Sequence, residues 1–240
     1  GTTAFRHFEL ALAILEERPE SVELAHTISG ISRLYMLACE YTQAIHWGER
    51  ALALADRLDA EAVSVHALNN VGASLGLSGQ WDRGLAMMRD SLNRALSLTL
   101  IYDASRAYYN LIELLQMMGN YAQARATAEE LFAYATRVHA SHYSSSALVR
   151  LMEIDWLSGR WADALQRRPE VIDWLTSHKS MMHLKLNATI LFSQIHNDLG
   201  QAQMARQELE DGLPLIRSAP EQHALILHLG ELLRAYDLLV

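Results

Sequence analysis

Residues 79–91 read GQWDRGLAMMRDS, and this stretch contains the features that decide the fold. Gly79 lies two residues before the aromatic Trp81, and a second glycine, Gly84, follows three positions after it. Apolar residues then recur at helical intervals, so the stretch predicts a tight turn that leads into an amphipathic helix. The same arrangement recurs along the chain every 40 residues.

Each copy has an aromatic residue, a small residue three positions after it and a turn residue two positions before it. The aromatic residues are Tyr41, Trp81, Tyr121 and Trp161. The small residues are Ala44, Gly84, Ala124 and Ala164, and the turn residues are Cys39, Gly79, Gly119 and Gly159. A further copy, shifted by one residue, contains Gly200, Ala202 and Ala205. A period of this length is typical of solenoids built from helical hairpins.

Each repeat is predicted to be a pair of helices, with a first helix before the turn and a second helix after it. We expect second helices at 4–18, 41–57, 81–97, 121–138, 161–176 and 202–217. We expect first helices at 22–38, 60–78, 102–118, 142–158, 181–198 and 221–238. These are about twelve antiparallel helices in an all-α fold, which we predict to be one domain over residues 1–240. Pro169 and Pro214 fall in or near second helices, where a kink or an early end is expected.

The pattern resembles the tetratricopeptide repeat (TPR), in a form lengthened to 40 residues. That family has small residues at three positions of the repeat, and Gly72, Gly84 and Ser91 meet all three. The resemblance implies a right-handed α-α superhelix, a TPR-like solenoid whose first helices line a concave groove. The run LNN at 68–70 is also similar to the sensor arrays of LuxR-like and maltose-activator-like bacterial regulators.

Composition excludes several classes of function. The formal net charge is −8 and no basic cluster is present, so we expect no direct contact with nucleic acid, which requires many neutralised phosphates. No apolar run approaches the roughly 18 residues of a membrane span, and no membrane association is expected. The single cysteine, Cys39, suits a reducing compartment, so we predict a cytoplasmic location.

The sequence lacks the motifs of common catalytic sites. It has no Gly-rich phosphate loop followed by Lys, no nucleophile elbow and no His-Glu-x-x-His. The closest histidine pairs are His139 with His142 and His178 with His183. The first pair has no third ligand at a metal-binding interval, and the spacing of the second pair does not keep both residues on one helix face. We therefore predict a module that is not an enzyme, with no metal site and no cofactor.

Positions of the first helices that face inward in related arrays define a candidate ligand- or peptide-binding groove. These residues are Arg33, His66, Asn69, Asn70, Arg106, Tyr109, Asn110, Glu113, Arg150, Glu153, Trp156 and Gln194. An amide side chain both donates and accepts hydrogen bonds. Asn70 and Asn110 are therefore expected either to bind the backbone of an extended peptide or to bridge adjacent helices.

Other groove residues also leave two alternatives. The arginines of the set either hold a ligand carboxylate or are neutralised by Glu113 and Glu153. Trp156 is either a stacking platform for a ligand or a residue of the groove wall.

Two functions fit such a groove. One is the sensor or protein-interaction region of a larger bacterial signalling or transcriptional regulator, which binds a protein, a peptide or a small-molecule effector. The other is a stand-alone adaptor for a partner's extended peptide. The chain starts on a second helix and ends on a first helix with the apolar residues 238–240, so we expect a piece of a longer array. End-to-end homodimerisation through these faces is the alternative.

Overall fold

The computed structural model describes residues 2–177 and 182–217, which form α-helices joined by short turns, with no β-strand among them. Two compact units make up the chain, residues 1–120 and residues 121–240. None of the described helices is both long and apolar enough to cross a membrane. The all-α fold that the sequence predicts is confirmed.

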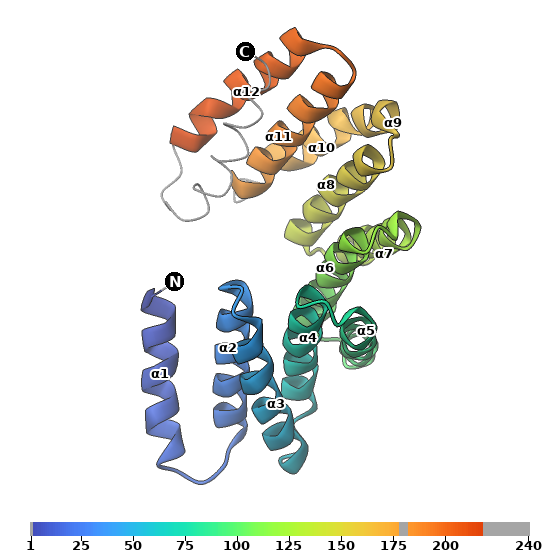
Figure 1. The fold of residues 1–240 in the computed structure, drawn as a ribbon. Helices are drawn as coiled ribbons and strands as arrows, with labels where there is room; N and C mark the ends of the chain where they lie inside the picture. Colours follow the sequence, from blue (N-terminus) through green and yellow to red (C-terminus); the bar gives the residue numbers. More distant parts are fainter. Residues whose placement is uncertain (1, 178–181, 218–240) are drawn as a thin grey trace. The chain divides into compact units, whose positions relative to one another are not determined.

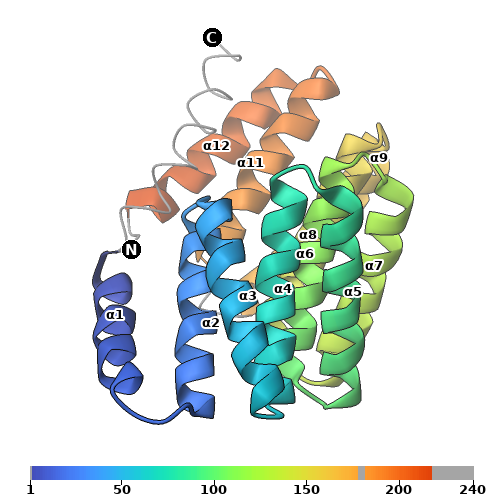
Figure 2. The ribbon, with the colours of Figure 1, turned by 60° about the horizontal axis from the view of Figure 1, so that its bottom comes forward.

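Unit 1 contains three first helices and three second helices. In chain order they are α1 (Thr2–Glu16), α2 (Val22–Leu37), α3 (Tyr41–Arg57), α4 (Glu61–Leu77), α5 (Trp81–Ser97) and α6 (Ile101–Met117). The first helix α4 contacts both α2 and α6, so these three form one layer (Figure 1). The second helices α3 and α5 pack on that layer from one side (Figure 2).

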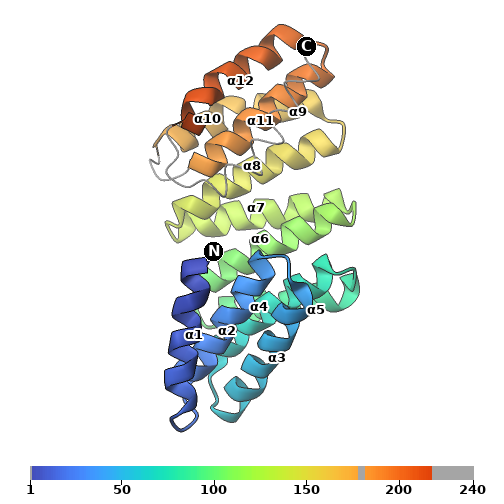
Figure 3. The same ribbon diagram turned by 60° about the vertical axis from the view of Figure 1, so that its left-hand side comes forward.

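Unit 2 continues the alternation of first and second helices. Its described helices are α7 (Tyr121–Arg137), α8 (Ser141–Leu157), α9 (Trp161–Gln166), α10 (Arg168–Ser177), α11 (Met182–Asp198) and α12 (Ala202–Arg217). The first helix α8 contacts α7, α9, α10 and α11, and α11 packs along α12 (Figure 3).

The observed helices agree with the predicted ones to within two residues, with one interruption. The second helix expected at 161–176 is two helices, α9 and α10, which meet at Arg167. Pro169 lies in the first turn of α10, where its missing N–H leaves no intrahelical hydrogen bond unmade. Pro214 does not end its helix early, because α12 continues through it to Arg217. The first helix predicted at 221–238 lies outside the described residues.

The recurring turn residues have a left-handed backbone. Gly79 has a φ of +91° and Gly119 a φ of +71°, and Cys39 adopts +60° at the equivalent position. The N–H of Gln80, the residue after Gly79, donates to the carbonyl of Leu75 at 2.9 Å, which closes the end of α4. Glycine recurs here because it adopts this conformation without steric cost.

Small residues allow α4 and α5 to pack closely. A Cβ atom on Gly84 would lie 2.7 Å from the carbonyl oxygen of Gly72, which is closer than two such atoms can approach. Ser91 of α5 is buried and donates its hydroxyl to the carbonyl of Val65 in α4 at 2.8 Å. The positions that match the TPR pattern are thus the positions where the two helices touch.

Candidate functional site

A buried hydrogen-bonded chain runs across the three first helices of unit 1. Ser29 of α2 places its hydroxyl 2.6 Å from Nδ1 of His66 in α4. Asn70 of α4 donates to the carbonyl of Ser29 at 3.0 Å, and Arg106 of α6 donates to Oδ1 of Asn70 at 2.7 Å. We call these four residues the wall network. It ties three successive repeats together through polar groups.

His66 is neutral within this network. Burial, together with the positive charges of Arg106, His26 and Arg33, lowers its pKa to about 3. Nδ1 of His66 faces two donors, the hydroxyl of Ser29 and, at 3.4 Å, the amide nitrogen of Asn70. This nitrogen therefore carries the lone pair, and the ring proton is assigned to Nε2. The ring of His26 stacks on His66 with centroids 5.7 Å apart.

Two arginines bring positive charge to the same layer of first helices, α2, α4 and α6, which we call the wall of unit 1. The guanidinium carbons of Arg33 and Arg106 each lie 5.7 Å from the centre of the Tyr102 ring. Arg106 is 3.5 Å from the carboxylate of Asp103, whose pKa is raised by burial in spite of the positive charges nearby. Among the described residues, Arg33 makes no ion pair. The wall can therefore accept a further negative charge beside Arg33.

The asparagines bridge first helices. Asn110 of α6 donates to Oδ1 of Asn69 in α4 at 3.0 Å, and Asn70 contacts both neighbouring helices through the wall network. Asn69 is fully buried, and its amide nitrogen has no hydrogen-bond partner within the part of the chain that the structure describes. Bridging between helices, one of the two alternatives for Asn70 and Asn110, is thus present.

The other predicted groove residues fall into both units. Tyr109 and Glu113 of α6 are partly buried in unit 1, and no ion pair joins Glu113 to an arginine among the described residues. In unit 2, Arg150 pairs with Glu153 on the same helix at 2.7 Å. The neutralisation expected for the arginines therefore occurs at Arg150.

Two further groove residues lie in unit 2. Trp156 donates its indole N–H to the carboxylate of Asp198 at 2.6 Å, so its polar edge joins α8 to α11. Gln194 of α11 is partly buried.

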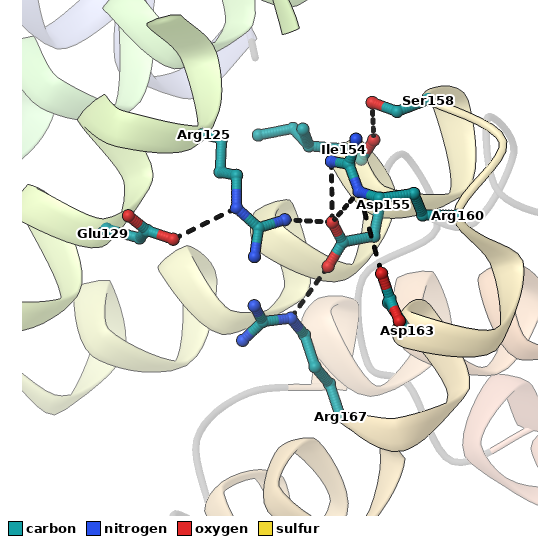
Figure 4. Close-up of polar contacts among 8 residues, drawn as sticks. All are labelled: Arg125, Glu129, Ile154, Asp155, Ser158, Arg160, Asp163 and Arg167. Carbon is teal, nitrogen blue, oxygen red and sulfur yellow. Dashed lines mark hydrogen bonds and ion pairs between the residues drawn. The ribbon is translucent and has the colours of Figure 1, made fainter. Parts of the chain in front are cut away.

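Sequence reasoning missed Tyr102 and Asp103, which enter the wall of unit 1 from the first turn of α6. It also missed Asp155, a fully buried carboxylate in unit 2 that accepts hydrogen bonds from Arg125, Arg160 and Arg167 (Figure 4). We call these three residues the arginine cluster. A signal for it was present in the sequence, because the equivalent residue one repeat earlier is an apolar leucine, at 115.

The geometry at Asp155 uses both carboxylate oxygens. Oδ1 accepts from Arg125 and, at 3.2 and 2.9 Å, from two nitrogens of Arg160. Oδ2 accepts from Nε of Arg167 at 2.9 Å. Burial raises the pKa of Asp155, but the hydrogen bonds from Arg167 and Arg160 and the charge of Arg125 outweigh it and hold the pKa below its usual value. Asp155 is ionised and joins α7, α8 and the α9–α10 junction.

Comparison with known proteins places the fold. No protein-family model matches the sequence, and no curated protein matches it significantly. Solved structures are similar in three dimensions. The Rap protein complexed with competence and sporulation factor has a TM-score of 0.70 at 16% identity, over 98% of this chain and 69% of that chain. NprR in complex with its cognate peptide NprX has a TM-score of 0.66 at 13% identity, over 95% of this chain and 68% of that chain.

A third similar structure is described as having TPR-like repeats. A kinesin light chain-like protein from Podosopora anserina with nearly identical TPR-like repeats has a TM-score of 0.65 at 14% identity, over 85% of this chain and 100% of that chain. The resemblance that the sequence shows is thereby confirmed in three dimensions, and the chain has the fold of a tetratricopeptide-type helical repeat protein.

Proposed function

We propose that the chain is a non-catalytic peptide-binding module whose ligand lies on the first-helix wall of unit 1. The observation that carries the proposal is the set of polar groups presented by α2, α4 and α6. Their cationic part is formed by Arg33 and Arg106 around Tyr102. Arg106 lies 3.5 Å from the carboxylate of Asp103, and Arg33 makes no ion pair among the described residues. An acidic side chain or a carboxyl terminus of a peptide would supply the missing charge beside Arg33.

Aromatic and amide groups suit the rest of such a peptide. Tyr102 is 49% exposed and offers its ring for contact. Asn110 is partly buried and keeps acceptor capacity on its amide oxygen, which can receive a backbone N–H of an extended chain. The wall network behind these groups holds them in place, so little ordering is needed when a ligand binds.

The similar structures support a peptide ligand. NprR was solved with its cognate peptide and the Rap protein with competence and sporulation factor. By analogy, we propose that this chain is the sensor or interaction region of a larger bacterial signalling or transcriptional regulator in the cytoplasm. A stand-alone adaptor that binds a partner's extended peptide is the second candidate, which the array of TPR-like repeats also suits.

The test is selection of binding peptides from a displayed library of random peptides on the purified chain. The selected peptides are synthesised, and their affinities are measured by calorimetry for the wild type, Arg33→Gln and Asn110→Ala. We expect enrichment of acidic peptides and a loss of affinity of about tenfold in Arg33→Gln, the usual effect of one charge-assisted hydrogen bond. Asn110→Ala is expected to weaken all selected peptides.

Arg83→Gln is the matched control, because Arg83 is exposed on the second helix α5 and bonds only Gln80 among the described residues. This variant should keep the wild-type affinity. If selected peptides bind equally well to all four proteins, the ligand does not lie on this wall. If no peptide is enriched, peptide binding itself is wrong for this chain.

A further inference from the structure

The arginine cluster of unit 2 holds more positive charge than Asp155 balances. Three guanidinium groups converge on one buried carboxylate. Glu129 lies 3.2 Å from Arg125 and Asp163 lies 4.0 Å from Arg160, but their side chains are 55% and 58% exposed. Water screens charges at such exposed positions, so these two acids compensate the buried side of the cluster weakly.

The cluster also has hydrogen-bond donors left over. Arg167 uses only Nε to reach Asp155, and its two terminal nitrogens bond no other described residue. Arg125 uses Nη1 for Asp155 and Nε for Glu129, which leaves Nη2 without a partner among the described residues. Figure 4 shows these remaining nitrogens of Arg125 and Arg167 on the same side of Asp155. The side chains of Arg125 and Arg167 are 31% and 24% exposed, so the donors are partly desolvated yet open to a ligand.

The donors are held in place before any ligand arrives. Asp155 is fully buried, and its two oxygens bind Arg125, from α7, and Arg167, from the α9–α10 junction. Interruption of the second helix at Arg167 allows this side chain to turn toward the end of α8. A guanidinium group held by one edge offers its remaining N–H groups as a fork, which matches two oxygens of an oxyanion.

We propose that Arg125 and Arg167, positioned by Asp155, form a binding site for an oxyanion of the phosphate class. The anion is either free phosphate or a phosphoryl group carried by a peptide. Two oxygens of the anion accept from the terminal nitrogens of Arg167, and a third accepts from Nη2 of Arg125. Arg160 contributes charge, since both of its bonds to Asp155 use its own fork. This site is separate from the wall of unit 1 and does not depend on the proposed peptide ligand.

The experiment is titration of the purified chain with inorganic phosphate, followed by calorimetry at constant ionic strength maintained with sodium chloride. Acetate and a short phosphoserine peptide are titrated in parallel. The variants are Arg167→Gln, Arg167→Lys and the control Arg168→Gln. Arg168 is the neighbouring residue, and it bonds Glu208 at 2.9 Å instead of Asp155. Arg167→Lys keeps a positive charge for Asp155 and removes the fork, so it tests the site even if Arg167→Gln fails to fold.

We expect phosphate to bind the wild type and Arg168→Gln with equal affinity. Binding should weaken by about tenfold or more in Arg167→Gln and Arg167→Lys, because charge-assisted hydrogen bonds are lost. Tighter binding of the phosphoserine peptide than of phosphate assigns the anion to a phosphorylated partner, and the reverse order assigns it to the free ion. Equal phosphate binding by the wild type and both Arg167 variants, equal binding of acetate and phosphate, or no phosphate binding at all would overturn the proposal.

Discussion

Single residues determine how the wall of unit 1 responds to pH. His66 accepts hydrogen bonds through Nδ1 and is neutral, with a pKa of about 3. In an unfolded chain the same imidazole has a pKa of about 6.5. Between these two pKa values, the imidazole binds a proton in the unfolded state but not in the folded state. The contribution of neutral His66 to the free energy of unfolding is therefore fully present above about pH 6.5 and is lost as the pH falls toward 3.

We predict that His66→Gln makes the stability of the chain less sensitive to acid. Between about pH 7 and about pH 4.5, the free energy of unfolding of the wild type should fall by about 2 kcal/mol more than that of the variant. Urea unfolding followed by circular dichroism at the two pH values gives this difference. His139→Gln, in an exposed turn, is the control and should behave like the wild type. Parallel losses in the wild type and His66→Gln would contradict the neutral buried state.

One turn between helices has a non-glycine residue in a left-handed backbone conformation. Thr99 is exposed and has a φ of +57°, a left-handed conformation that is strained for a β-branched residue. Thr99→Gly should raise the free energy of unfolding by about 1 kcal/mol, because the relief of strain exceeds the extra chain entropy of glycine. The urea midpoint measures the change. The reverse change at an equivalent left-handed turn, Gly119→Thr, should lower the midpoint, and a lower midpoint for Thr99→Gly itself would exclude relieved strain.

At the scale of helices, the crossing of α4 and α5 depends on the absence of side chains. The Cβ atom of an alanine at 84 would meet backbone atoms of Gly72 and Gly76 at 2.7–2.8 Å. These backbone atoms cannot change rotamer as the end of a flexible side chain can. The helices must therefore move apart to admit the methyl group.

We predict that Gly84→Ala lowers the free energy of unfolding by about 2 kcal/mol, the usual cost of overpacking a well-packed core. The opposite effect is expected from helix propensity alone, since alanine favours helix over glycine. Asn93→Ala, at an exposed position of α5, provides the control and should not destabilise the chain. Stabilisation by Gly84→Ala would mean that the two helices are farther apart than described.

At the scale of the whole molecule, the chain consists of two compact units. The sequence predicts one domain over residues 1–240, and the helices group into units 1–120 and 121–240. In a repeat array, each repeat is stabilised by its neighbours, so unfolding spreads along the chain. Weak coupling between units would instead allow each to unfold separately.

We predict that the two units unfold together, as one repeat domain does. Unit 1 contains Trp47 and Trp81, and unit 2 contains Trp156, Trp161 and Trp174. Variants that keep the tryptophans of one unit and replace the others by phenylalanine report each unit by fluorescence. The urea midpoints of the two reporters should coincide with each other and with the midpoint from circular dichroism. Two separated midpoints would show two domains and contradict the prediction.

The sequence by itself determined the repeat, the alternation of helices and the turns between them. These features depend on local chemistry. A left-handed turn selects glycine, as at Gly79, and a close helix crossing selects small residues, as at Gly84. The interruption near Pro169 agrees with the sequence, because proline acts on its own helix, whereas α12 continues through Pro214.

Only the tertiary structure decided which polar side chains are partners. Asn70 reaches Ser29 and Arg106, residues 41 and 36 positions away, and Asp155 collects three arginines from three separate segments. A hydrogen bond depends on distance and angle within a few tenths of an ångström. Periodicity places a residue on a face of a helix, and it does not place one guanidinium against one carboxylate. For this reason the sequence only nominates candidate groove positions on the first helices. It marks Asp155 as a departure from the apolar residue one repeat earlier, but it does not name the arginines that bind this carboxylate.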